Sequence, residues 1–138
     1  SRVDKMSKVR QLFKHLHCGS TTPEGLCYEA VMKDMIMTTD KMDSYFLNFS
    51  DGMPMYSNDS IYYSGDEARK HTRDMVNKMR KMGIKVLSYF INDRYYGDDD
   101  DTTAMIYFRH MYGYDAEQID ILSIPAVART MNNLFLEK

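Results

Sequence analysis

Apolar residues recur along this chain in two patterns, one typical of helices and one typical of buried strands. In the helical stretches they return every three to four residues, as Met6, Val9 and Phe13 do. Short apolar runs between these stretches, bounded by turn residues, indicate strands covered on both faces. The predicted elements, in chain order, are helices over 4–17 and 23–38, a strand over 44–49, a helix over 64–82, a strand over 84–91, a helix over 102–112, a strand over 119–122 and a helix over 125–137.

This order predicts an α/β fold in which strands alternate with helices, forming a single domain over residues 1–138. Helix-then-strand spacing is typical of parallel crossovers, so we expect a parallel sheet with helices on both faces, a three-layer Rossmann-like architecture. Three strands are fewer than the mean of about five to six. Either further strands escape this pattern, or the first strands of a truncated domain lie upstream of Ser1, which is not an initiator methionine.

The helix over 23–38 is expected to start after a capping hydroxyl of Thr21 or Thr22, with Pro23 in its first turn. Ser64 and Glu67 have the spacing of a capping box at the next helix. The predicted buried stripes are Leu26, Ala30, Val31 and Met35 in the former helix, and Ala68, Thr72, Met75, Met79 and Met82 in the latter.

The composition narrows the class of protein. Hydrophobic residues make up 43% of the chain and charged residues 28%, which is typical of a folded globular domain. The net charge of -2 provides no overall field to attract nucleic acid or an anionic membrane, and no apolar run reaches the roughly 20 residues of a membrane helix. Two cysteines are few for a secreted scaffold, so we expect reduced thiols in a cytoplasmic protein, with a Cys18–Cys27 disulfide as the alternative.

The strongest chemical signal is Ser50-Asp51-Gly52, directly after the predicted strand over 44–49. A carboxylate at the carboxyl end of a parallel strand points into the crevice where open α/β sheets bind ligands. Thr22 precedes a helix start, and helix starts gather at the same edge. Because carboxylate and hydroxyl oxygens suit a hard cation, we predict a Mg²⁺ site at this edge that includes Asp51 and a hydroxyl of the Thr21–Thr22 pair.

Other candidate sites have plainer interpretations. His15, His17, Cys18 and Cys27 are zinc-type ligands, but two histidines two residues apart on a helix diverge. The run 98–101 of four aspartates lacks the alternation of a calcium loop and is typical of a solvated loop. The basic face over 69–81 either contacts an acidic partner or faces water. No sequence motif supports a hydrolytic metalloenzyme that uses His71 or His110. The phosphate-binding GxxxxGK[ST] loop is also absent from the sequence.

Taken together, the segments resemble the second half of a von Willebrand factor type A domain. Hydroxyls precede a helix, a strand ends in Ser50-Asp51-Gly52-Met53-Pro54, and a helix leads through Gly83-Ile84-Lys85-Val86 into the next strand. Within that family, His71-Thr72-Arg73-Asp74-Met75 is similar to the C-terminal domain of CobT-type cobaltochelatase subunits, of which viral genomes carry copies. The resemblance spans about 19–135.

The resemblance implies a metal-ion-dependent adhesion site in which Thr22 and Asp51 are Mg²⁺ ligands and Ser50 supports them. The family's Asp-x-Ser-x-Ser motif is absent from this sequence, so weak or absent Mg²⁺ binding is expected. The implied function is a non-catalytic scaffold beside a ring-forming ATPase that drives cobalt insertion into a corrin. The alternative is a type A protein-binding module unrelated to chelatase. If strands are missing, the exposed sheet edge favours a homodimer.

Overall fold

The computed structural model describes residues 21–35, 37, 39, 42–91, 101–114, 116–119 and 129. The predicted helices over 4–17 and 125–137 lie outside these residues, apart from position 129. The elements are α2 (Glu24–Val31), the 3₁₀ helix η2 (Met32–Asp34), β1 (Tyr45–Ser50), β2 (Tyr56–Ser57), β3 (Tyr62–Tyr63), α3 (Gly65–Lys81), β4 (Lys85–Ile91), α4 (Asp101–Tyr112) and β5 (Glu117–Ile119).

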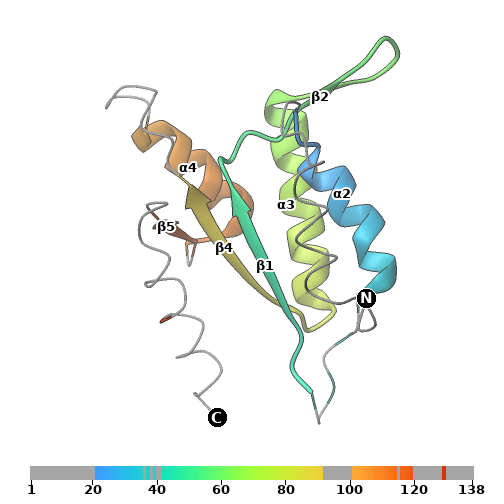
Figure 1. The fold of residues 1–138 in the computed structure, drawn as a ribbon, viewed down its shortest axis with the longest axis vertical. Helices are drawn as coiled ribbons and strands as arrows, with labels where there is room; N and C mark the ends of the chain where they lie inside the picture. Colours follow the sequence, from blue (N-terminus) through green and yellow to red (C-terminus); the bar gives the residue numbers. More distant parts are fainter. Residues whose placement is uncertain are drawn as a thin grey trace, which may run out of the picture.

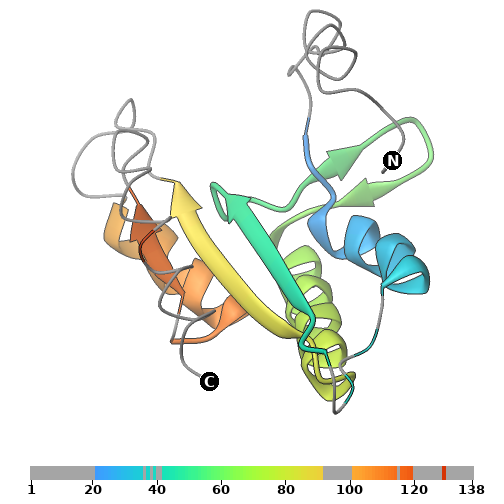
Figure 2. The ribbon, with the colours of Figure 1, turned by 60° about the horizontal axis from the view of Figure 1, so that its bottom comes forward.

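Strands β1, β4 and β5 form a parallel sheet in that order, as Figures 1 and 2 show. Tyr45 pairs with Lys85 and Ser50 with Phe90, so β1 and β4 end at the same edge. Each strand is joined to the next through a helix, α3 or α4. The α/β class and the parallel sheet predicted from the sequence are therefore confirmed, and the third strand starts two residues earlier than predicted.

The described helices cover one face of this sheet. Phe46 and Val86 are register partners and share a face with Phe90, because alternate residues of a strand point the same way. Phe46 contacts Tyr28 of α2, and Phe90 contacts Phe108 of α4. Val86 belongs to the same core cluster as Val76 and Met79 of α3. Figure 2 shows α4 and α3 behind the sheet and α2 beside α3, beyond the edge strand β1.

The buried face of α2 differs from the predicted stripe. Leu26 and Val31 are exposed, whereas Gly25, Tyr28 and Met32 are buried together with Glu24. A β-carbon at Gly25 would lie 2.5 Å from the Tyr63 hydroxyl oxygen and 3.0 Å from the Thr72 backbone nitrogen. The face of α2 that packs against α3 is thus determined by close approach of the two backbones and by polar contacts. The spacing of apolar residues does not reveal either of these.

Two predicted helix starts were also wrong in detail. Pro23 occupies the position before α2 and no side chain caps this helix, so neither Thr21 nor Thr22 has the expected capping role. Ser64 precedes α3, as predicted, but makes no side-chain capping hydrogen bond. Helix α2 ends at Val31 and continues only as η2, because Met35 is already extended.

The segment between β1 and α3, where the sequence predicts neither helix nor strand, contains a small antiparallel hairpin of β2 and β3. The Asn58 side-chain oxygen accepts hydrogen bonds from the backbone N–H groups of Ser60 and Ile61, which closes the turn. Tyr62 of this hairpin is exposed, while Tyr63 is buried beside α3. Within the described residues, no helix is long and apolar enough to cross a membrane.

Candidate functional site at the carboxyl end of β1

The candidate site is the loop that leaves β1, which packs against the segment that starts α2. The Met55 N–H donates to the Thr22 carbonyl oxygen at 3.0 Å, and the Glu24 N–H donates to the same oxygen at 3.0 Å. Below this backbone contact, the Ser50 hydroxyl donates to a carboxylate oxygen of Glu24. The structure therefore brings the two segments that carry the predicted site residues to one edge of the sheet, as expected.

Gly52 allows the loop to turn directly over the core. Its φ of 73° lies in the left-handed region that favours glycine. A β-carbon there would lie 3.1 Å from Cδ2 of Phe108, which is fully buried in α4. Pro54 is buried next to it, whereas Met53 is 71% exposed. The loop conformation is thus fixed from below by the α4 core and presents Asp51 and Met53 to solvent.

The three predicted ligands have different surroundings. Asp51 is exposed, and its Oδ1 accepts the Met53 N–H at 3.0 Å, which makes a local turn. Thr22 is exposed, and no hydrogen bond joins its side chain to Asp51 in the part of the chain described. Ser50 is buried, accepts the Gly52 N–H at 2.9 Å and donates to Glu24. Asp51 and Thr22 share an edge, while the Ser50 hydroxyl is engaged below it.

Sequence reasoning missed Glu24, which is the centre of a buried polar network. Its second carboxylate oxygen accepts the Tyr112 hydroxyl at 2.6 Å, and the Tyr112 and Tyr28 hydroxyl oxygens lie 2.8 Å apart. Because the Tyr112 proton is directed at Glu24, Tyr28 is the donor to Tyr112. The network joins α2, β1 and the last turn of α4. The spacing of Glu24, Tyr28 and Met32, four residues apart, is the signal that would have placed Glu24 on the buried face.

Burial determines the protonation of this network. Desolvation raises the pKa of the Glu24 carboxyl above its ordinary value, although the hydrogen bonds from Ser50 and Tyr112 act in the opposite direction and Asp51 adds to the rise. Burial, followed by the nearby Glu24, raises the pKa of both Tyr28 and Tyr112. The tyrosines therefore stay neutral donors. Every described polar atom at the centre of the network has a partner, which is typical of a structural hub.

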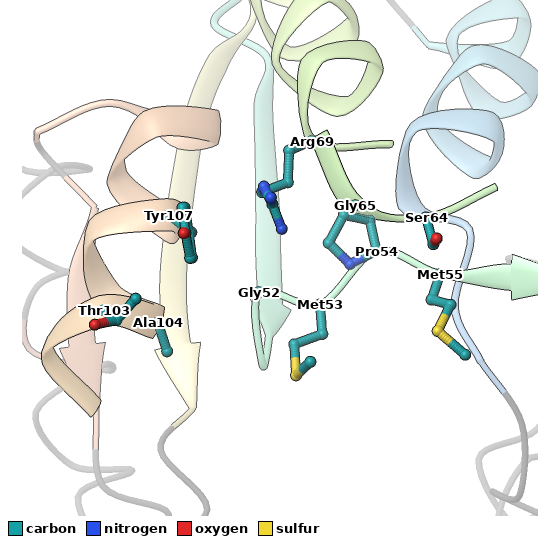
Figure 3. A pocket seen from close by; sticks show the side chains of 10 residues that line it. All are labelled: Gly52, Met53, Pro54, Met55, Ser64, Gly65, Arg69, Thr103, Ala104 and Tyr107. Atoms are coloured by element: carbon teal, nitrogen blue, oxygen red, sulfur yellow. The ribbon is translucent and has the colours of Figure 1, made fainter. Parts of the chain in front are cut away.

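A cavity of about 210 Å³ opens beside the loop, between the starts of α3 and α4 (Figure 3). The loop residues Gly52 to Met55 line one side, and Tyr107 of α4 lines the other. The Arg69 guanidinium lies 4.3 Å from the Tyr107 ring centroid and 2.7 Å from an Asp66 oxygen. The lining is mostly apolar with one cation, at the edge where α/β sheets bind ligands.

The residues of the alternative sites are dispersed or lie outside the description. His15, His17, Cys18 and the run 98–100 are among the undescribed residues, and Cys27 is exposed. His71 Nδ1 lies 3.1 Å from the Tyr63 hydroxyl, whereas His110 Nε2 contacts Arg73 at 2.9 Å. The two histidines therefore have separate partners, and neither contact resembles a nucleophile with its base.

Comparison of this chain with protein-family models, with curated proteins and with solved structures gives no match.

Proposed function

We propose that this chain is an interaction domain of the von Willebrand factor type A class, with a role like that of the CobT-type cobaltochelatase subunit. In that role it is a non-catalytic scaffold for a ring-forming ATPase in cobalt insertion. The observation that carries the proposal is the pairing of the Ser50-Asp51-Gly52 turn with the Thr22–Glu24 segment at one sheet edge. In the type A family, these two segments present the contact residues to the partner.

The described residues do not fit a complete Mg²⁺ site. No group of three His, Cys, Asp or Glu side chains able to hold a metal ion occurs among them. Asp51 provides one exposed carboxylate, and the Ser50 hydroxyl already donates to Glu24. Since Mg²⁺ demands near-octahedral oxygen coordination, one carboxylate and the Thr22 hydroxyl leave most positions to water. The proposed scaffold therefore relies on direct protein contacts of the Asp51 loop.

Weak Mg²⁺ binding at Asp51 is the expected result of a titration followed by NMR of the backbone amides. The signals of Gly52 and Met53 should move without reaching saturation, because a single carboxylate holds the ion. Asp51→Asn should abolish the movement, and Asp59→Asn, which changes an exposed aspartate of the hairpin turn, should leave it intact. Saturating binding that survives Asp51→Asn would show that the ligands lie elsewhere.

The scaffold role is tested by capture of a purified cobaltochelatase ring ATPase on the immobilised chain. The proposal predicts capture by the wild-type chain and weaker capture by Asp51→Asn or Met53→Asp, because the β1 loop presents these two side chains. Asp59→Asn should capture the ATPase as well as the wild type does. A parallel experiment with EDTA separates an ion-bridged contact from a direct one. Absence of capture, or measurable hydrolytic turnover by the chain alone, contradicts it.

The second candidate is a type A protein-binding module unrelated to chelatase. The observation that favours it is the apolar surface carried by the same loop and by the hairpin, where Met53, Ile61 and Tyr62 are exposed. Exposed apolar side chains on loops are more typical of protein contacts than of catalysis. Capture of another partner through these residues, with no capture of the ring ATPase, would favour this candidate.

Self-association through β1 is a further expected property. Among the described strands, β1 pairs only with β4 and stands at the edge of the sheet. Edge strands are templates for pairing with another copy, so we expect a homodimer in solution. Light scattering coupled to size exclusion should give twice the 16.2 kDa chain mass, and Leu47→Pro should shift the profile toward one chain mass. A monomeric wild-type profile at high concentration would contradict the expectation.

A further inference from the structure

Helices α3 and α4 line a basic groove. Two hollows of about 500 and 410 Å³ lie along it and share Arg73, Ile106 and His110 in their walls, so they are neighbours. The contact of Arg73 with His110 Nε2 at 2.9 Å joins α3 to α4 at these shared residues. The hollow nearer the start of α3 also shares Arg69 and Tyr107 with the cavity beside the Asp51 loop. The groove therefore runs along α3 from the carboxyl edge of the sheet toward the end of α4.

The charge of this groove is strongly one-sided. The described residues that line it include five cations and a single carboxylate, Asp66, which is already paired with Arg69. The cations are Arg69, Lys70, Arg73, Arg80 and Arg109. The chain as a whole has a net charge of -2, so this positive potential is local to the groove and opposite in sign to the rest of the protein.

Apolar side chains interrupt the basic lining. Ile106 is 60% exposed in the shared wall, and Tyr114 is 93% exposed at the far end. Exposed apolar residues within a cationic groove are typical of surfaces that bind a charged segment together with an apolar anchor.

The lining also distinguishes between classes of anionic partner. Single-stranded nucleic acid is bound by stacking bases on free aromatic faces. Here one face of the Tyr107 ring is covered by the Arg69 guanidinium at 4.3 Å, and the neighbouring wall is the aliphatic Ile106. Tyr114 at the far end offers a single exposed ring, so the described lining has no row of free aromatic faces for successive bases. The arrangement suits an aliphatic side chain better than a base.

We propose that the α3–α4 groove binds an extended acidic peptide segment of a partner protein, anchored by a large aliphatic side chain against Ile106. The part of α3 that lines the groove, from Asp66 to Arg80, is about 21 Å long at 1.5 Å per residue. An extended segment of about six or seven residues spans this length. The proposal goes beyond the scaffold function, because it involves a surface other than the Asp51 loop.

The test uses the full chain and a fluorescein-labelled nine-residue peptide of glutamates with two central leucines, measured by anisotropy at low salt. We expect saturable binding that weakens with added salt. Lys70→Glu combined with Arg109→Glu should weaken it at least about tenfold, because the groove loses two of its cations and gains two like charges. The matched control, Lys33→Glu combined with Lys78→Glu, reverses two exposed lysines outside the groove and should change it less than about twofold.

Three competitor ligands complete the design, and thermal melts verify that both double variants are folded. A peptide with glutamines in place of glutamates should not bind, and one with serines in place of leucines should bind several-fold more weakly. Tighter binding of a nine-nucleotide single-stranded DNA would overturn the proposal in favour of nucleic acid. Equal weakening by the control variant, or no binding of the acidic peptide, would overturn it in favour of a solvated face.

Discussion

Phe108→Ala is expected to lower the free energy of unfolding by about 3–5 kcal/mol, the usual cost of truncating a buried aromatic side chain. Phe108 is fully buried, and its ring packs against Phe90 of β4 and Tyr112 of α4, with centroid distances of 5.3 and 4.5 Å. It also lies directly beneath Gly52. The truncation should therefore loosen the Ser50–Gly52 turn as well as the core. Urea denaturation measures the loss in the free energy of unfolding.

The control for this variant is Phe49→Ala. Phe49 is 47% exposed and stacks on Tyr89, and strand alternation places it on the face opposite the described helices. Its truncation should cost less than about 2 kcal/mol, because about half of the side chain already contacts solvent. Equal costs for the two variants would mean that the core is not centred between the sheet and α4.

Glu24→Ala is expected to lower the free energy of unfolding by about 2–4 kcal/mol, although glutamate is ordinarily a surface residue. The variant removes the acceptor of the Ser50 and Tyr112 hydroxyls and leaves both donors buried without it. Glu24→Gln keeps an acceptor oxygen and should recover most of the loss. Denaturation of the two variants at one pH measures this difference, and a neutral Glu24→Ala would contradict the hub role.

Comparison of wild type with Glu24→Gln gives a pH dependence of defined sign. Burial raises the native pKa of Glu24 above its ordinary value of 4.5, so the folded state favours the protonated form. Its contribution to stability is fully present below the ordinary pKa and is lost as the pH rises through the native pKa. The stability of wild type relative to Glu24→Gln should thus fall on going upward from pH 4.5. A difference that rises with pH would mean that the hydrogen bonds outweigh desolvation.

The parallel sheet was predictable because its signals are local and long. The strand over 84–91 is a predominantly apolar run, interrupted only by Lys85 and Ser88. The helix before it carries a sustained stripe, of which Ala68, Thr72 and Met79 are buried as predicted. The hairpin of β2 and β3 was not predictable, because each strand has two residues and carries no alternating pattern. The prediction of the buried stripe of α2 was wrong, because Gly25 is buried for steric reasons and Glu24 for polar ones.

The proximity of the two segments that carry the predicted site residues was predictable, whereas their contacts were not. The sequence placed Asp51 and Thr22 at one edge because strand ends and helix starts meet there in parallel folds. It could not reveal that Ser50 donates to a buried carboxylate, since that contact depends on the approach of α2 to β1 and joins residues 26 apart in the chain. Glu24 resembles any solvated first-turn glutamate until the packing of α4 is known.

The central claim is that the start of α2 and the end of β1 form one physical unit through Glu24 and Ser50. A double-mutant cycle with Glu24→Ala and Ser50→Ala, followed by urea denaturation, tests it most directly. We predict a coupling free energy of about 1–3 kcal/mol for this pair. The control cycle replaces Ser50→Ala with Ser88→Ala, which removes a buried hydroxyl on β4. Its effect and that of Glu24→Ala should be additive within about 0.5 kcal/mol. Additive effects of Glu24→Ala and Ser50→Ala would contradict the claim.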